Sequence, residues 1–277
     1  DESMIAQGSS MYLKVGDTVH LSDLAKGMMM ASGNDAANAA AVSIGGDTEK
    51  FAALMNKRAK SIGMSNTNFV TPSGLDDENH YSTAYDMALL MDCAMKNEKF
   101  AQITGEKSMT VDFLTPQKQV VYNNHNRLLS MYEYCIGGKT GYTKSAGRCL
   151  VSVAEKNGLT LIAVTFNAPD DWNDHMKMYD YGFSRISAID TDDSDEQFTI
   201  DVVGSDKSEI SVGCDVSENI AVSKDDKEKV ERVVYMPRFV YAPINKGECI
   251  GMVTYTLDGE IVAQNPVFAK EHVDRIT

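Results

Sequence analysis

Residues 137–164 read GGKTGYTKSAGRCLVSVAEKNGLTLIAV, and this segment is the most informative about the fold. Runs of aliphatic and β-branched residues alternate there with turn formers such as Asn-Gly and Ser-Ala-Gly, which is typical of an antiparallel sheet. We expect strands over 136–143 and 148–155, joined by a turn at 144–147. A third, strongly apolar strand is expected over 159–167.

Helices are expected on both sides of this strand segment. Residues 34–44 are rich in alanine at helical spacing, and an apolar stripe follows Asp47, which is expected to cap the next helix. Ser22 is interpreted as the N-cap of an earlier helix, and Thr83 as the start of a capping box. Beyond the strands, apolar residues at helical spacing predict a helix over 172–186.

A boundary between two domains is expected at the acidic run DTDDSDE, residues 190–196. The run has no apolar residue and is interpreted as a solvated linker. Short alternating strands follow it, and Asp258-Gly259 is a hairpin signal between the last two; they are expected at 198–203, 231–236, 251–256 and 261–264. We therefore predict an α+β domain over 1–189, with an antiparallel sheet flanked by helices, and a small all-β domain over 190–277.

Composition excludes several classes of function. The formal net charge is −14, and the 26 Lys and Arg residues form no basic cluster, so no nucleic-acid partner is expected. The five histidines are isolated and no Cys-x-x-Cys occurs, so no metal and no cofactor are expected. No run of about 18 apolar residues indicates a membrane span. The five cysteines are widely spaced: Cys93, Cys135, Cys149, Cys214 and Cys249.

Two short motifs carry candidate chemistry. Ser32-Gly33-Asn34 lies between two expected helices, and Lys139-Thr140-Gly141 lies on an expected strand after two glycines. Either triplet alone has an ordinary structural explanation: helix capping for the first and an exposed strand end for the second. Their order is more informative, because S-x-N followed by K-T-G belongs to the signature of penicillin-binding proteins and class A β-lactamases.

Longer segments extend this similarity over almost the whole chain. The sequence resembles the low-molecular-weight penicillin-binding proteins, the serine-type D-Ala-D-Ala carboxypeptidases of peptidase family S11. The resemblance implies a β-lactamase/transpeptidase-like domain followed by a β-rich domain. The segments that carry it, besides 137–164, are ASGNDAANAAA (31–41), FAALMNKRAKSIGMSNTNF (51–69), TPSGLDDENHYSTAYDMALL (71–90) and APINKGECIGMVTYTLDGEIV (242–262).

The resemblance also implies a function. The expected substrate is a peptidoglycan stem peptide that ends in D-Ala-D-Ala, and the expected reaction removes the last D-alanine through an acyl-enzyme. β-Lactam antibiotics would acylate the same serine. The enzyme would work outside the cytoplasmic membrane, in the cell envelope or secreted.

Site residues follow from the two motifs. Ser32 and Asn34 are expected to be catalytic, with the Ser32 hydroxyl relaying a proton to the leaving amine and the Asn34 amide holding a substrate carbonyl. Lys139 is expected to be catalytic and to bind the terminal carboxylate. The remaining substrate-binding residues are expected to be Thr140 through its hydroxyl, Gly141 through close approach to the strand, Tyr142 through an oxyanion N–H implied by the resemblance, and Arg148 through its charge. A surface ion pair is the alternative for Arg148.

The nucleophile of this family is the serine of S-x-x-K, and no lysine of this chain has a serine three positions before it. Thr104 and Thr115 have the spacing, but both follow Ser32, which is the wrong order. We therefore expect the nucleophile segment to have been lost or to be on a separate chain, and residues 1–277 alone to be inactive. A β-lactamase is one alternative, which the β-rich region after residue 190 argues against; a non-catalytic cell-wall interaction module is another.

Overall fold

The computed structural model describes residues 7–215 and 219–276, and the chain forms two compact units. The first contains Asp1–Lys156 and Thr160–Tyr181; the second contains Asn157–Leu159 and Gly182–Thr277. The α+β class and the β-rich C-terminal region are as predicted. The predicted domain boundary between residues 189 and 190 stays a prediction.

The first unit is built on the sheet that the segment 137–164 predicts. Strands β4 (Cys135–Thr143), β5 (Gly147–Lys156) and β6 (Leu159–Thr165) follow one another in the order β4-β5-β6. Strand β4 pairs antiparallel with β5, and Lys139 lies opposite Val151. Within the described residues β4 is therefore an edge strand of this sheet, and it carries the Lys-Thr-Gly motif.

Five helices lie within residues 21–105, ahead of this sheet, and the expected caps of two of them are present. The Asp47 carboxylate accepts a hydrogen bond from the Lys50 N–H, and the Thr83 hydroxyl accepts one from the Asp86 N–H. Ser22 as an N-cap is wrong, because the first helix already begins at Leu21 and the backbone carbonyl of His20 accepts the Leu24 N–H. The helices are α1 (Leu21–Met30), α2 (Asn34–Gly45), α3 (Thr48–Ser61), α4 (Ala84–Met95) and α5 (Glu98–Gly105).

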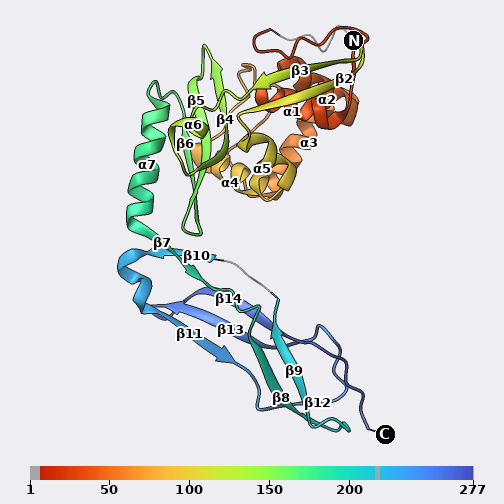
Figure 1. Ribbon diagram of the computed structural model, residues 1–277, viewed down its shortest axis with the longest axis vertical. Coiled ribbons are helices and arrows are strands. Elements are labelled where there is room, and N and C mark those ends of the chain that lie inside the picture. The colour runs from red at the N-terminus through yellow and green to blue at the C-terminus, as the bar shows by residue number, and fades with distance from the viewer. Residues whose placement is uncertain (1–6, 216–218, 277) are drawn as a thin grey trace. The chain divides into compact units, whose positions relative to one another are not determined.

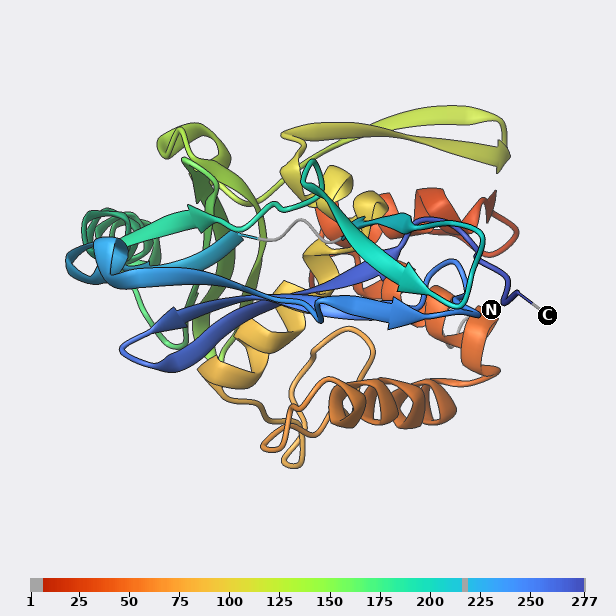
Figure 2. The same cartoon turned by 90° about the horizontal axis from the view of Figure 1, so that it is seen from below.

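The two faces of the sheet are covered differently. Val151 and Val153 of β5 pack against Met91 of α4 on one face, while Ser152, which alternates with them, contacts α7 (Asp171–Arg185) on the other. Figure 1 shows α7 on one side of β4, β5 and β6 and the helices α1 to α5 on the other. The remaining elements of this unit are β1 (Thr18–Val19), β2 (Ser108–Thr115), β3 (Lys118–Asn123) and α6 (Leu128–Met131). Strands β2 and β3 form the long hairpin that Figure 2 shows beside the helices.

The second unit has a six-stranded sheet in the order β11-β13-β14-β9-β8-β12. The expected hairpin at Asp258-Gly259 joins β13 to β14, and both residues have positive φ, as a two-residue turn of type I′ requires. The strands are β8 (Gln197–Val203), β9 (Glu209–Cys214), β11 (Val230–Tyr235), β12 (Phe239–Tyr241), β13 (Cys249–Leu257) and β14 (Glu260–Ala269). A separate pair, β7 (Ile186–Asp190) and β10 (Asn219–Ser223), leads into the 3-10 helix Lys224–Lys229.

The solvated linker predicted at 190–196 is wrong. Asp193 is 2% exposed, and its carboxylate accepts hydrogen bonds from Arg232 (Nη2–Oδ1, 2.7 Å), Tyr255 (Oη–Oδ1, 3.0 Å) and Asn265 (Nδ2–Oδ2, 2.7 Å). Thr191 is also buried, and its backbone carbonyl accepts a second bond from Asn265. The acidic run therefore packs against the sheet, because the Asp193 carboxylate accepts hydrogen bonds from residues of β11, β13 and β14.

Candidate active site

Ser32 lies in the short connection between α1 and α2, in a conformation that is unusual for serine. Its φ is 51°, in the left-handed region that residues other than glycine seldom adopt and that often marks functional positions. Helix capping does not explain the motif, because the N-cap of α2 is Gly33 and no side chain makes a cap hydrogen bond there. The strained backbone presents the Ser32 hydroxyl just before the helix begins.

Asn34 begins α2, and its side chain is held in place. The residue is 9% exposed, and its Nδ2 donates to the backbone carbonyl of Gln7 at 2.7 Å. The next residue, Asp35, is a positioning residue that sequence reasoning missed. Its buried carboxylate accepts from the N–H groups of Met11 (3.0 Å) and Leu13 (2.9 Å), which fixes the preceding segment against the start of α2. The signal in the sequence was an aspartate directly after the Ser-Gly-Asn triplet.

Lys139 joins the two motifs across 107 residues of sequence. Its ammonium group donates hydrogen bonds to the Ser32 hydroxyl and to the Thr140 carbonyl, the latter at 2.7 Å. Among the described residues no carboxylate forms an ion pair with it. Desolvation by burial lowers the pKa of Lys139 to about 8, so about nine tenths of it is still protonated at pH 7. The site thus holds a cation without a protein counter-ion.

The glycines of β4 have different reasons to be glycine. Gly138 has a φ of 144°, and a Cβ there would lie 2.5 Å from the Val151 carbonyl oxygen, so the strand requires glycine. A Cβ on Gly141 would meet the Cβ of Cys149 at 3.7 Å, an ordinary contact. The fold therefore does not demand glycine at 141. Next to it, Tyr142 is 72% exposed and lies opposite Arg148 on β5.

Arg148 is engaged in an ion pair, which was the alternative considered for it. Its guanidinium contacts the buried Asp171 carboxylate through two bonds, Nη2–Oδ1 at 2.7 Å and Nε–Oδ2 at 3.1 Å, and lies 5.5 Å from the Trp172 ring centroid. Asp171 and Trp172 begin α7, so this pair ties β5 to that helix. The structure brings Ser32, Lys139 and Thr140 together but shows Arg148 occupied elsewhere.

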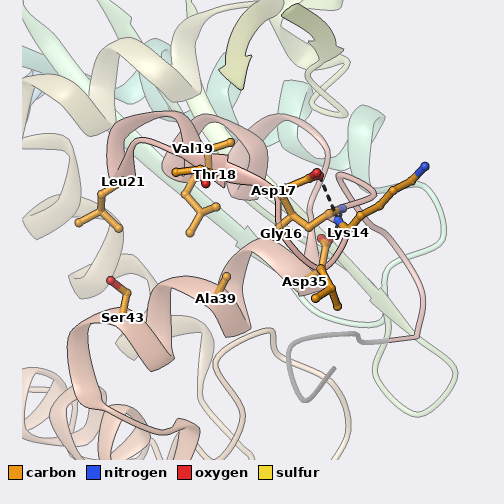
Figure 3. Close-up of a pocket in the computed structure, with 12 residues that line it drawn as sticks. Lys14, Gly16, Asp17, Thr18, Val19, Leu21, Asp35, Ala39 and Ser43 are labelled. Atoms are coloured by element: carbon orange, nitrogen blue, oxygen red, sulfur yellow. Dashed lines mark hydrogen bonds between the residues drawn. The ribbon is translucent and has the colours of Figure 1, made fainter. Parts of the chain in front are cut away.

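A groove of about 270 Å³ is lined by Asp35, the residue after Asn34, but not by Ser32, Asn34 or Lys139. Its walls are the segment from Leu13 to Val19 and the face of α2 that carries Asp35, Ala39 and Ser43, as Figure 3 shows. The Lys14 N–H donates to Asp17 Oδ2 at 3.0 Å in its outer wall. We place the candidate chemistry at Ser32 and Lys139 rather than in this groove, because none of the residues of the two motifs lines it.

Comparison with known proteins identifies the family. The family model for D-alanyl-D-alanine carboxypeptidase matches residues 2–170. The chain belongs to the D-alanyl-D-alanine carboxypeptidase family. A second model, the C-terminal domain of penicillin-binding protein 5, matches residues 192–275. These matches confirm the family resemblance and the fold class that the sequence predicted.

Relatives of this carboxypeptidase family cover most of the chain. D-alanyl-D-alanine carboxypeptidase DacF of Bacillus subtilis is 35% identical, over 97% of this chain and 70% of its own length. DacC of Escherichia coli is 34% identical, over 97% of this chain and 68% of its own length. The crystal structure of penicillin-binding protein 5 from Haemophilus influenzae is similar with a TM-score of 0.76 at 30% identity, covering 99% of this chain and 81% of that one.

Three further features concern metal ligands, membrane-spanning helices and disulfides. Among residues 7–215 and 219–276, no three His, Cys, Asp or Glu side chains gather as metal ligands would. In the same residues no helix has the length and apolar character needed to cross a membrane. All five cysteines are free thiols.

Proposed function

We propose that this protein is a serine-type carboxypeptidase that removes the terminal D-alanine from peptidoglycan stem peptides through an acyl-enzyme. The observation that carries the proposal is the hydrogen bond from Lys139 to the Ser32 hydroxyl, which unites both motifs in a member of the carboxypeptidase family. Because its substrate would be cell-wall peptide, the enzyme works outside the cytoplasmic membrane. Residues 1–189 form the catalytic domain in this proposal, and 190–277 form the β-rich domain.

The peptide binds along the edge strand β4. Its terminal carboxylate accepts hydrogen bonds from the Lys139 ammonium and the Thr140 hydroxyl. The carboxylate also supplies a counter-ion, which Lys139 does not have among the described residues. The peptide backbone adds to β4 as a further strand, and Gly141 leaves room for it. The Tyr142 N–H stabilises the oxyanion, a contact that is worth roughly 3–4 kcal/mol of barrier in other hydrolases. Arg148 contributes positive charge to the carboxylate site only if its ion pair with Asp171 breaks when the peptide binds.

The proton of the reaction travels through Ser32. As the peptide C–N bond breaks, the leaving D-alanine nitrogen takes a proton from the Ser32 hydroxyl, which in turn receives one from a neighbouring ammonium group. Lys139 is in contact with this hydroxyl, and its ammonium group can supply that proton. The Asn34 amide holds the substrate carbonyl from the other motif.

The acylated serine is not among residues 1–277 in this proposal, because no Ser-x-x-Lys occurs there. A segment outside this sequence supplies it, and penicillins acylate the same serine. The chain alone therefore binds substrate but forms no covalent intermediate, and the residual rate it supplies over water is small.

Mass spectrometry after exposure to penicillin tests these statements together. Residues 1–277 should gain no adduct, whereas the protein supplemented with a family segment that carries Ser-x-x-Lys should gain one penicillin on that segment. The supplemented Lys139→Met variant, which keeps side-chain length but loses the charge, should acylate at least about a hundredfold more slowly. A stoichiometric adduct on residues 1–277, or full reactivity of the variant, would contradict the proposal.

A further inference from the structure

The segment between β3 and α6 presents a histidine that neither sequence motif includes. Asn124 and Asn126 anchor this segment on either side of His125. The Asn124 Nδ2 donates to the carbonyls of Thr104 (3.1 Å) and Glu106 (3.0 Å), and the Asn126 N–H donates to Asn124 Oδ1 (2.9 Å). His125 itself is exposed. A firmly held backbone therefore carries an accessible imidazole.

This segment lies against β4 immediately before Lys139. Asn126 is 3% exposed, and its Nδ2 donates to the Gly137 carbonyl at 3.3 Å; the same Nδ2 lies 3.1 Å from where a Cβ on Gly138 would be. His125 is one residue from this contact, and the positive charge of Lys139 reaches it. Although the residue is exposed overall, desolvation of the ring first, and that charge second, lower the pKa of His125 below its usual value.

Neither His125 nor Lys139 has a carboxylate partner among residues 7–215 and 219–276. Among the described residues neither Lys139 nor His125 makes an ion pair, although the chain has a net charge of −14. The charge of Lys139 acts on His125. Two nitrogen donors near one strand edge, neither paired with a carboxylate of the described residues, form a place suited to a carboxylate of a ligand.

We propose that His125 is a second recognition group for the terminal carboxylate of the peptide and takes up a proton when that carboxylate binds. The inference rests on the proposed function and deepens it by naming a pH-dependent contact. A bound carboxylate neutralises the charge of Lys139 and adds negative charge beside His125. Both changes favour the imidazolium, so binding and protonation reinforce each other.

Acidification should strengthen peptide binding. Peptide affinity should rise as the pH falls from about 8 to 6, because protons and peptide bind together; the peptide carboxyl, with a usual pKa of about 3.5, does not titrate in that range. Above pH 8 a second loss of affinity should follow the deprotonation of Lys139. The titratable or charged groups on this segment and on the elements packed against it are Glu106, Lys107, Arg127, Cys135 and Lys139.

Isothermal titration calorimetry of this chain with diacetyl-L-lysyl-D-alanyl-D-alanine measures the linkage, since this chain binds without turnover in the proposed function. Binding heats in two buffers of different ionisation enthalpy at pH 6.5 give the number of protons taken up. We expect on the order of 0.5 proton for the chain and none for His125→Gln. The variant should bind roughly three- to tenfold more weakly at pH 6, and less than about twofold more weakly at pH 8.

Two controls separate the inference from the proposed function. His20→Gln changes an exposed histidine at the start of α1 and should retain both affinity and proton uptake. The same peptide with a C-terminal amide should bind far more weakly. If acid and amide bind equally, or neither binds, the carboxylate site itself is wrong and the inference falls with it. If the acid binds selectively but without proton uptake, or if His125→Gln retains the uptake, only the inference is overturned.

Discussion

Lowering the pH from 7.5 to 5 should destabilise the first unit of the fold through His175. This residue of α7 is fully buried, and both ring nitrogens contact hydroxyl groups: Nδ1 lies 2.7 Å from Ser152 Oγ, and Nε2 lies 3.0 Å from Thr165 Oγ1. The Tyr179 hydroxyl lies 2.6 Å from the same Ser152 oxygen. One imidazole therefore links α7 to β5 and β6 behind the Lys-Thr-Gly strand.

The magnitude follows from the shift in protonation. Desolvation by burial lowers the pKa of His175 from 6.5 to about 4 in the folded protein. Between these values the unfolded chain binds more protons than the folded one, so stability contributed above pH 6.5 is lost as the pH falls towards 4. Integrating the difference gives a loss of about 2 kcal/mol in the free energy of unfolding between pH 7.5 and pH 5.

Urea unfolding followed by Trp172 fluorescence measures this loss, because Trp172 is the only tryptophan and is in the same helix as His175. The comparison is with His175→Gln, which is neutral at every pH. The stability of the natural protein minus that of the variant should shrink by about 2 kcal/mol from pH 7.5 to pH 5. Curves of stability against pH that run parallel for the two proteins would refute the reasoning.

Three other substitutions test the packing. Asp193→Asn should destabilise the second unit by about 2–4 kcal/mol, because Arg232 loses the negative charge of its buried partner. Hydrogen exchange of the β13 amides should accelerate accordingly, and unchanged exchange would restore the solvated-linker interpretation. Gly138→Ala should cost about 3 kcal/mol, because its Cβ would collide with a carbonyl oxygen. Gly141→Ala is the matched control and should cost less than about 1 kcal/mol while weakening peptide binding; equal thermal shifts for the two alanines would contradict the analysis of β4.

Features encoded by neighbouring residues could be predicted from the sequence. The caps at Asp47 and Thr83 and the hairpin at Asp258-Gly259 depend on groups within a few positions, and all three are present. Strand β12 was missed because three residues, Phe239–Tyr241, are too few to show a period. Asp193 was misinterpreted because its donors are 39 to 72 residues away, and a run of acidic residues looks the same whether it is solvated or paired.

The candidate site was predictable in its composition but not in its contacts. The order of the two motifs indicated that Ser32 and Lys139 belong to one site, and the structure shows them hydrogen-bonded. The Asp171 partner of Arg148 could not be foreseen, because it depends on how α7 returns to β5. Asp35 accepts hydrogen bonds from the backbone N–H groups of Met11 and Leu13, and every residue type except proline offers such a donor, so the aspartate after the triplet was the only signal. The roles of these residues towards substrate stay predictions.

Release of D-alanine is the measurement that tests the proposed function most directly. The protein supplemented with a Ser-x-x-Lys segment should release one D-alanine from each diacetyl-L-lysyl-D-alanyl-D-alanine, and Lys139→Met should lower kcat/KM by at least about a hundredfold. The same peptide ending in L-alanine should release almost none. No release above the uncatalysed rate by the supplemented protein, or an unchanged kcat/KM in the Lys139→Met variant, would contradict the account.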